Sequence, residues 1–325
     1  EAKAGQMTVR ETPVGPAVLD GPVDDRLPWL QHPRISSRVA LGEGGPLSSR
    51  PSSSTSADQR TLSTAPLTVV AAVLNERENI EPFLENLSWV DHIVAVDHGS
   101  VDGSRELLES HPAVEVIDAP AGEGLIEDIR RLGLEKVTNG WVLVLDLDER
   151  VTDDLRREIE ELLESESPES GYHIPFRHYL LGRWLQHGGW ADQHLRLFKA
   201  GHGDYLPGLI HADAIVNGTV GQLKGKILHF AHPTIHDFLA RMNRYTTQSA
   251  PALARGEVGG LRKRRMLPPS RFKWLRASAS VFWCRYFKDR GFKDGMPGFI
   301  TAVLLAAYIF IEQSKAWECQ LESHR

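Results

Sequence analysis

Cysteine is scarce in this chain, with only Cys284 and Cys319 among its 325 residues. Their separation matches neither a metal-binding spacing nor a redox motif, so we expect no zinc finger and no disulfide framework. An excess of positive charge is also lacking, because the formal net charge is -6. The molecule as a whole is therefore not expected to bind nucleic acid.

Long apolar stretches are missing as well. The first forty residues lack the apolar core of a secretory signal, so we expect none. The longest apolar run, Phe299–Ile311, is shorter than the roughly 20 residues that a membrane-spanning helix needs. The sequence therefore predicts a poor membrane span and a cytoplasmic protein.

The composition changes abruptly near residue 67. Residues 1–66 are rich in proline, glycine and serine and show no helical or strand periodicity, which predicts a disordered or loosely attached tail. From Leu67 onward, apolar strand patterns alternate with amphipathic helical patterns. We expect a main domain at 67–250 and a basic, aromatic helical extension at 251–325.

The alternation itself predicts the fold class. Four apolar segments read as strands, and each of the first three is followed by a helical pattern, which is the rhythm of a parallel α/β sheet. We expect a mostly parallel, Rossmann-like central sheet flanked by helices. Asn79 is expected to cap the first helix, and Asp102 or Ser104 the second. The expected strands are 67–75, 92–97, 114–118 and 141–145.

Polar side chains follow every one of these strands. Ligands of parallel sheets bind beyond the carboxyl ends of the strands, so these side chains are expected to converge at one edge. The residues concerned are Asn75, Glu76, Asp97, Asp118, Asp146, Asp148 and Glu149.

Asp146 and Asp148 form a D-x-D pair directly after the fourth strand. In an extended segment they project to the same side, with Leu147 turned toward the core. Two carboxylates in that position suit Mg²⁺ or Mn²⁺ that also binds a substrate diphosphate. The simple alternative is that the acids decorate a loop or cap the next helix. A haloacid dehalogenase-type phosphatase is disfavoured, because its D-x-D normally follows the first strand.

Five passages together resemble family 2 glycosyltransferases with the GT-A fold, in the branch that includes lipopolysaccharide core β-glucosyltransferases. They cover about 67–318. The resemblance implies an inverting enzyme of cell-envelope polysaccharide synthesis that moves a sugar from a nucleotide-sugar, with UDP-sugar first among the candidates, to a hydroxyl of a glycan or lipid-linked acceptor. The passages are "NERENI", "VDHGSVDGS", "WVLVLDLDER", "GRWLQHGGWADQHLRLF" and "LKGKILHFAHPTIHDFLARMNRYTTQSA".

The same resemblance implies a role for individual residues. Asp192 corresponds to the catalytic base, which would take the proton of the acceptor hydroxyl. The donor-binding residues implied are Asn75, Glu76, Asp97, Arg130, Asp146 and Asp148, and the residues implied near a Mn²⁺ or Mg²⁺ ion are Asp146, Asp148 and His211.

The chain departs from the family pattern at His98 and at Ala212, where the latter loses a carboxylate beside His211. A non-catalytic nucleotide-sugar-binding or membrane scaffold protein on a degenerate GT-A fold therefore remains the alternative. A nucleotidyltransferase is disfavoured, because no glycine-rich loop follows the first strand.

Basic and aromatic residues are interleaved in the segment from Arg255 to Asp294. This pattern favours an anionic membrane surface as a partner and peripheral attachment to its inner face. The alternative is a helical subdomain whose aromatic residues pack on the main domain.

Overall fold

The computed structural model describes residues 65–120, 126–205, 214–256 and 270–323. The predicted tail at 1–66 lies outside this part of the chain, apart from its last two residues. The described residues all belong to one unit, 57–325. The division of that unit into 67–250 and 251–325 stays a prediction.

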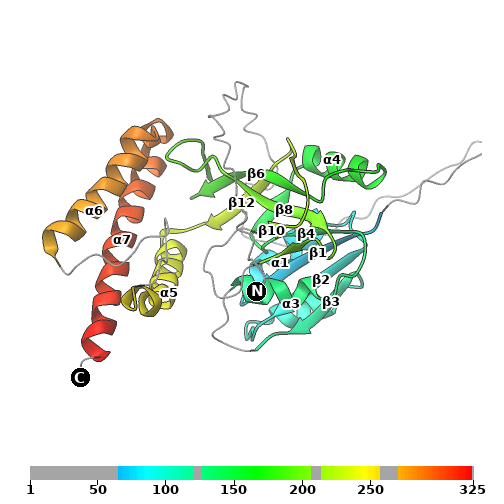
Figure 1. Cartoon of the computed structure of the whole chain (residues 1–325), viewed down its shortest axis with the longest axis horizontal. Helices are drawn as coiled ribbons and strands as arrows, with labels where there is room; N and C mark the ends of the chain where they lie inside the picture. Colours follow the sequence, from blue (N-terminus) through cyan, green and yellow to red (C-terminus); the bar gives the residue numbers. More distant parts are fainter. Residues whose placement is uncertain (1–64, 121–125, 206–213, 257–269, 324–325) are drawn as a thin grey trace, which may run out of the picture. The chain divides into compact units, whose positions relative to one another are not determined.

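Four parallel strands form the first half of the central sheet (Figure 1). They are β1 (Leu67–Val73), β2 (His92–Asp97), β3 (Val114–Asp118) and β4 (Trp141–Val144), in the order β3-β2-β1-β4. Each of these strands was predicted from its apolar pattern. Because β1 pairs with both β2 and β4, the carboxyl ends of all four strands lie along one edge.

Helices cover both faces of this half of the sheet, which explains why β1 is apolar throughout. Val69 and Ala71 pack in a core with α1 (Arg77–Asn86), α2 (Ser104–Glu109) and α4 (Asp153–Leu163). Val70 and Ala72 pack in a second core with Ile129 of α3 (Ile126–Leu134). A strand buried on both faces loses the polar–apolar alternation of a half-exposed strand.

The second half of the sheet is mixed. The sheet continues from β4 through β8 (Gln193–Lys199), β6 (Gly171–Leu180) and β12 (Ile227–His232) to β5 (Glu149–Val151). Strand β8 runs antiparallel to both β4 and β6. The remaining strands are β7 (Arg183–Leu185), β9 (Gly203–Asp204), β10 (Ile215–Val216) and β11 (Val220–Gln222). The sheet and its helices confirm the predicted GT-A-like fold class.

The predicted helix caps were wrong in detail. Helix α1 has Glu76 at its N-cap, and Asn79 lies in the first turn, where its Nδ2 donates to Glu76 Oε2 at 2.6 Å. Helix α2 begins after Gly103, which adopts a left-handed conformation, although Asp102 still accepts a hydrogen bond from the Ser104 amide at 3.0 Å. Both shifts place a polar side chain in the loops that follow β1 and β2.

The described part of the C-terminal region is helical, as predicted for the extension 251–325. It begins with α5 (Ile235–Ala254), most of which precedes residue 251, and continues with α6 (Arg271–Trp283), a π-helical turn (Cys284–Lys288), a 3₁₀ turn (Gly291–Asp294) and α7 (Gly295–Ser323). Helices α5 and α6 both pack on α7, partly through Phe238, Val281 and Leu305.

The stretch Gly291–Glu322 is long and apolar enough to cross a membrane, judged by length and composition alone. Core helices of soluble proteins meet the same criterion. In this helix Glu312 is buried and accepts a hydrogen bond from Ser249 of α5 at 2.8 Å. The helix extends well beyond the apolar run Phe299–Ile311 on which the sequence expectation of a poor span was based.

The C-terminal turns are tied to the loop between β7 and β8. Asp294 accepts hydrogen bonds from the His187 amide and ring, both at 2.8 Å. Arg285 Nη1 donates to the carbonyl oxygens of Gly188 and Gly189 at 2.8 and 2.9 Å. A Cβ at Gly189 would lie 1.9 Å from that guanidinium nitrogen, so only glycine allows this approach.

Leu143 of β4 is fully buried in the first core. We expect Leu143→Ala to lower the free energy of unfolding by about 2–5 kcal/mol, since it removes apolar contacts and leaves a cavity. Val101→Ala, at a side chain that is 89% exposed, should change it by less than about 0.5 kcal/mol. Chemical denaturation monitored by circular dichroism measures both, and equal effects would contradict the packing described for β4.

Candidate active site

The acids at the end of β4 are balanced by arginine side chains. Arg130 of α3 donates from Nη2 to both carboxylate oxygens of Asp146, at 2.5 and 2.7 Å. Arg196 of β8 lies 3.7 Å from the same carboxylate. Burial raises the pKa of Asp146, but the two guanidinium charges outweigh it, so the pKa lies below its ordinary value. Asp146 is therefore ionised at neutral pH.

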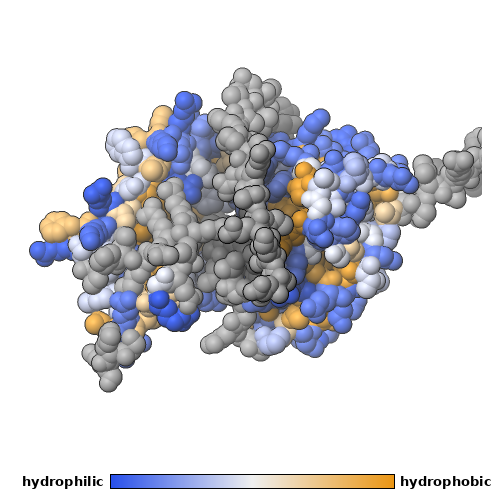
Figure 2. Space-filling view, viewed as in Figure 1, coloured by the Kyte–Doolittle hydropathy of each residue, from blue (hydrophilic) through white to orange (hydrophobic). Residues whose placement is uncertain are grey.

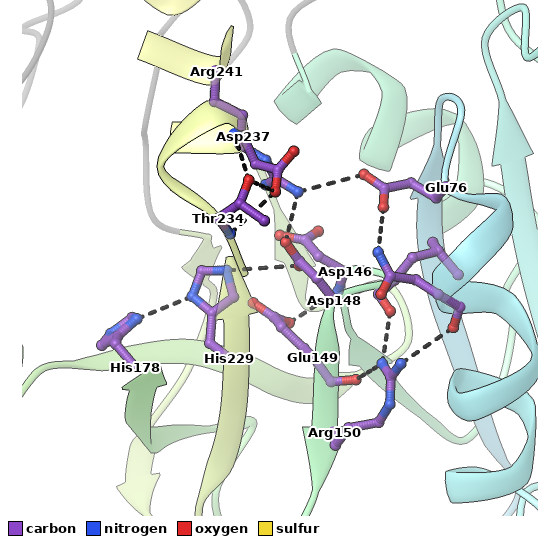
Figure 3. A network of polar contacts seen from close by, with 12 residues as sticks. Glu76, Asp146, Asp148, Glu149, Arg150, His178, His229, Thr234, Asp237 and Arg241 are labelled. Carbon is purple, nitrogen blue, oxygen red and sulfur yellow. Dashed lines mark hydrogen bonds and ion pairs between the residues drawn. The ribbon is translucent and has the colours of Figure 1, made fainter. Parts of the chain in front are cut away.

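Asp148 has a different set of partners. Its Oδ1 lies 3.6 Å from Nε2 of His229 on β12, and its Oδ2 lies 2.9 Å from Nη2 of Arg241 on α5. Burial opposes ionisation, yet His229 and then Arg241 hold the pKa of Asp148 well below its usual range. Figure 3 shows Arg241 lying between this acid cluster and Glu76. The distance from Arg241 Nη2 to Glu76 Oε1 is 3.6 Å.

Glu149 completes the acid cluster and is fully buried. Its Oε1 accepts a hydrogen bond from Arg196 Nη2 at 2.9 Å, and its Oε2 accepts one from the Asp146 amide at 2.9 Å. Burial raises the pKa of Glu149, although Arg196 acts against that shift. Glu149 thus fixes the backbone of the D-x-D turn, and Leu147 is turned into the core as predicted.

The loops after β1 and β2 form a second group of polar residues. Asn75 has a φ of 55° and donates its amide hydrogen to Ser100 Oγ at 3.0 Å. The Ser100 amide in turn donates to Asp97 Oδ1 at 3.2 Å. Asp97 is buried, and Arg105 lies 3.7 Å from its other oxygen. The structure therefore brings Asn75 and Asp97 together, next to Glu76 at the edge of the acid cluster.

Asp192, the predicted base, precedes β8. Its Oδ1 accepts a hydrogen bond from His178 Nε2 at 2.7 Å, and its Oδ2 lies 3.5 Å from His194 Nε2. Burial raises the pKa of this carboxyl, but the hydrogen bonds from His178 and His194 hold it well below its ordinary value. Asp192 is 41% exposed, so a substrate can reach it.

A continuous chain of side chains links Asp192 to the acid cluster. His178 Nδ1 and His229 Nδ1 are 3.0 Å apart, and His229 is the residue that faces Asp148. Figure 3 shows the two imidazole rings pointing toward each other from neighbouring strands. The D-x-D acids and Asp192 therefore belong to one site.

The residues present fit a divalent ion only in part. Within the described ranges there is no group of three or more His, Cys, Asp and Glu side chains arranged to hold a metal ion. Asp148 Oδ2 is buried and has no hydrogen bond, although the Arg241 guanidinium is in contact with it. The carboxylate of Asp148 suits a Mg²⁺ or Mn²⁺ ion whose remaining ligands are substrate phosphates and water. The imidazole of His229 suits such an ion less well, because the effect of burial is outweighed by the acids beside it, which raise its pKa and favour the protonated ring.

The sequence prediction of this site was incomplete. His211 lies outside the described residues, so its expected place near a metal is untested by the geometry. His178, His229 and Arg241 were not singled out, although His229 and Arg241 lie within the passage "LKGKILHFAHPTIHDFLARMNRYTTQSA". That passage carried the family likeness, but single histidine and arginine residues in it had no distinguishing spacing.

Comparisons with known proteins identify similar sequences. Residues 68–179 match the family model described as "Glycosyl transferase family 2". The "Lipopolysaccharide core biosynthesis glycosyltransferase LpsC" of Rhizobium meliloti (strain 1021) is 28% identical over 264 residues, which span 78% of this chain and 92% of that protein. The "Uncharacterized glycosyltransferase RP128" of Rickettsia prowazekii (strain Madrid E) is 20% identical over 276 residues, spanning 78% of this chain and 84% of that protein.

Among solved structures, that of S. aureus TarS 1-349 in complex with UDP-GlcNAc is similar, with a TM-score of 0.41 and 12% identity, over 80% of this chain and 91% of that chain. The fold and the family match define a glycosyltransferase with a GT-A-like sheet. The match to glycosyltransferase family 2 over residues 68–179, together with the similarity to LpsC, supports the resemblance that the sequence predicted.

The Arg196–Glu149 pair lends itself to a stability test. We expect Arg196→Met to destabilise the fold by about 3–5 kcal/mol, because it leaves the buried Glu149 carboxylate without its cation. Adding Glu149→Gln should restore part of the loss, since the neutral amide still accepts from the Asp146 amide. Denaturant unfolding compares the variants with Arg157→Met, at an exposed pair with Asp154. A double variant as unstable as Arg196→Met would contradict this account.

Proposed function

We propose that this protein is an inverting glycosyltransferase that uses a nucleoside diphosphate sugar, with a UDP-sugar as the first candidate, and Mn²⁺ or Mg²⁺. The acceptor is a hydroxyl of a glycan or of a lipid-linked saccharide. The observation that carries the proposal is the chain of contacts from Asp148 through His229 and His178 to Asp192. It connects acids suited to a diphosphate with an exposed carboxylate suited to an acceptor hydroxyl.

Asp192 is the proposed general base. Its lowered pKa keeps it ionised at neutral pH, which is the form that accepts a proton. The acceptor oxygen would attack the anomeric carbon as Asp192 takes its proton, while the bond from that carbon to the diphosphate breaks. Attack on the side opposite the leaving group inverts the anomeric configuration.

The departing diphosphate needs positive charge beside it. Arg130 and Arg241 both line the acid cluster, and guanidinium groups match phosphate oxygens in a two-pronged hydrogen-bonding geometry. A divalent ion bound by Asp148 would supply further charge neutralisation for the leaving group. Asn75 and Asp97 are proposed to contact the nucleoside. Asn75 directly precedes Glu76 in the loop after β1, and Asp97, at the end of β2, is linked to Asn75 through Ser100.

The name of the Rhizobium relative supports a saccharide of the cell envelope as the acceptor. A lipid-linked acceptor would agree with the surface of the C-terminal helices. Phe272, Trp283 and Met296 are 73%, 61% and 67% exposed, and basic side chains such as Lys273 and Arg276 lie beside them in the sequence. On the face shown in Figure 2, apolar patches over this part of the chain alternate with hydrophilic ones. We propose peripheral attachment to the inner face of an anionic membrane.

Asp192→Asn is expected to lower kcat about 10²–10⁴-fold, equivalent to roughly 3–5 kcal/mol in the barrier, because the amide cannot accept the proton. The affinity for UDP in the presence of Mn²⁺ should be unchanged, and it is measured by the shift in thermal unfolding temperature. The assay measures UDP release from a panel of UDP-sugars with and without acceptor saccharides. Near-normal turnover of Asp192→Asn would refute the base, and a wild-type protein that binds but never turns over would favour a scaffold.

The full chain is expected to float with anionic vesicles and to remain in solution with neutral ones. Lys273→Glu together with Arg276→Glu should weaken vesicle binding at least tenfold, because each basic residue near an anionic surface contributes about 1 kcal/mol. Trp283→Ser together with Phe287→Ser should also weaken it. Val101→Ser, at an exposed apolar side chain far from these helices in the sequence, is the control. Equal flotation of all variants would contradict a role for this surface in membrane binding.

A further inference from the structure

His178 is held in one orientation by its surroundings. The residue is buried on β6, where its ring centroid lies 5.7 Å from that of Phe176 and 5.3 Å from that of Trp190. Both of its ring nitrogens have a partner, Asp192 on one side and His229 on the other. A histidine present only to fill space would not need partners at both nitrogens.

The partners determine where the protons lie. The carboxylate of Asp192 can only accept, so His178 must donate from Nε2. Burial lowers the pKa of His178, which favours the neutral ring with a single proton. Its Nδ1 is then an acceptor, and the hydrogen of the 3.0 Å contact comes from His229 Nδ1. His229 is left with Nε2 toward Asp148.

The hydrogen bonds between these side chains therefore all run in one direction. Hydrogen-bond donation runs from His229 to His178 and from His178 to Asp192, starting beside Asp148. The second oxygen of Asp192 lies 3.5 Å from His194 Nε2, a longer contact than the 2.7 Å to His178. His178 therefore holds one oxygen of the carboxylate more closely, and the other is the one that an incoming hydroxyl would approach.

We propose that His178 is a positioning residue for Asp192. It holds Oδ1 through Nε2–H so that the second carboxylate oxygen faces the acceptor hydroxyl, and His229 sets the orientation of the His178 ring from the side of the acid cluster. This inference rests on the proposed role of Asp192 as the base. It assigns to His178 an effect on the chemical step rather than on donor binding.

The experiment compares two substitutions of His178 in the full-length protein. His178→Phe keeps an aromatic ring between Phe176 and Trp190 but removes the donor. His178→Gln keeps an N–H near the position of Nε2. We expect His178→Phe to lower kcat about 10–100-fold with the KM for the donor changed less than twofold, and His178→Gln to recover most of that loss. His92→Gln, at a half-exposed histidine near the start of β2, is the matched control and should behave as wild type.

The pH profile supplies a readout that a loss of packing would not change. The titratable groups facing Asp192 are His178 from β6 and His194 from β8. Removing His178 removes a hydrogen bond that lowers the pKa of Asp192. That pKa rises, so the acid limb of kcat/KM should move to higher pH in His178→Phe and stay near its wild-type position in His178→Gln.

A double variant separates this inference from the proposed function. If His178 acts through Asp192, adding His178→Phe to Asp192→Asn should cause almost no further loss of kcat. Wild-type kcat in His178→Phe, or equal losses in the Phe and Gln variants, would overturn the inference while leaving Asp192 as the base. Near-normal activity of Asp192→Asn alone would instead overturn the proposed base.

Discussion

The site depends on the balance between buried carboxylates and guanidinium groups. Three acids, Asp146, Asp148 and Glu149, lie within one short turn and would repel one another if left alone. Arg196 and Arg241 each bind one or two of these acids, and Arg130 binds Asp146. Breaking such a buried pair costs more than forming it gains, so the network enforces the arrangement of the elements that carry it.

Each arginine reaches the turn from a different part of the chain. Arg130 comes from α3 before β4, Arg196 from β8, and Arg241 from α5, which follows the last strand. The turn is therefore complete only when segments more than a hundred residues apart have come together. This explains why the parallel half of the sheet alone, β1 to β4, cannot form the site.

The sequence predicted the parallel half of the fold well. Strand β1 is apolar at every position because helices cover both of its faces, and short apolar strands that alternate with helices are a local pattern. The mixed half was not predicted, since β8 pairs antiparallel with β4 and β6 through contacts that are distant in the chain. The misplaced cap at Asn79 shows the same limit on a smaller scale. Its side chain bonds to Glu76, so the helix begins at Arg77, before Asn79.

The candidate site was predicted to a similar extent. Asp146 and Asp148 were predicted because they directly follow a strand, and Asp192 was predicted from the family resemblance. The arginines were harder to interpret, because an isolated arginine in a helix has no spacing that marks its partner. The sequence prediction placed a divalent cation between the acids. In the described residues the guanidinium groups of Arg130, Arg196 and Arg241 lie beside these acids, and a metal ion stays a proposal.

The link between Arg285 and the backbone of Gly188 and Gly189 has a practical consequence for shortened versions of this chain. A fragment ending at the close of α5 would keep the whole sheet yet lose the guanidinium that satisfies those two carbonyl groups. The left-handed glycine pair would then be free to rearrange a few residues before Asp192. A well-expressed catalytic fragment without its last seventy residues would therefore be a misleading reagent for measuring acceptor preference.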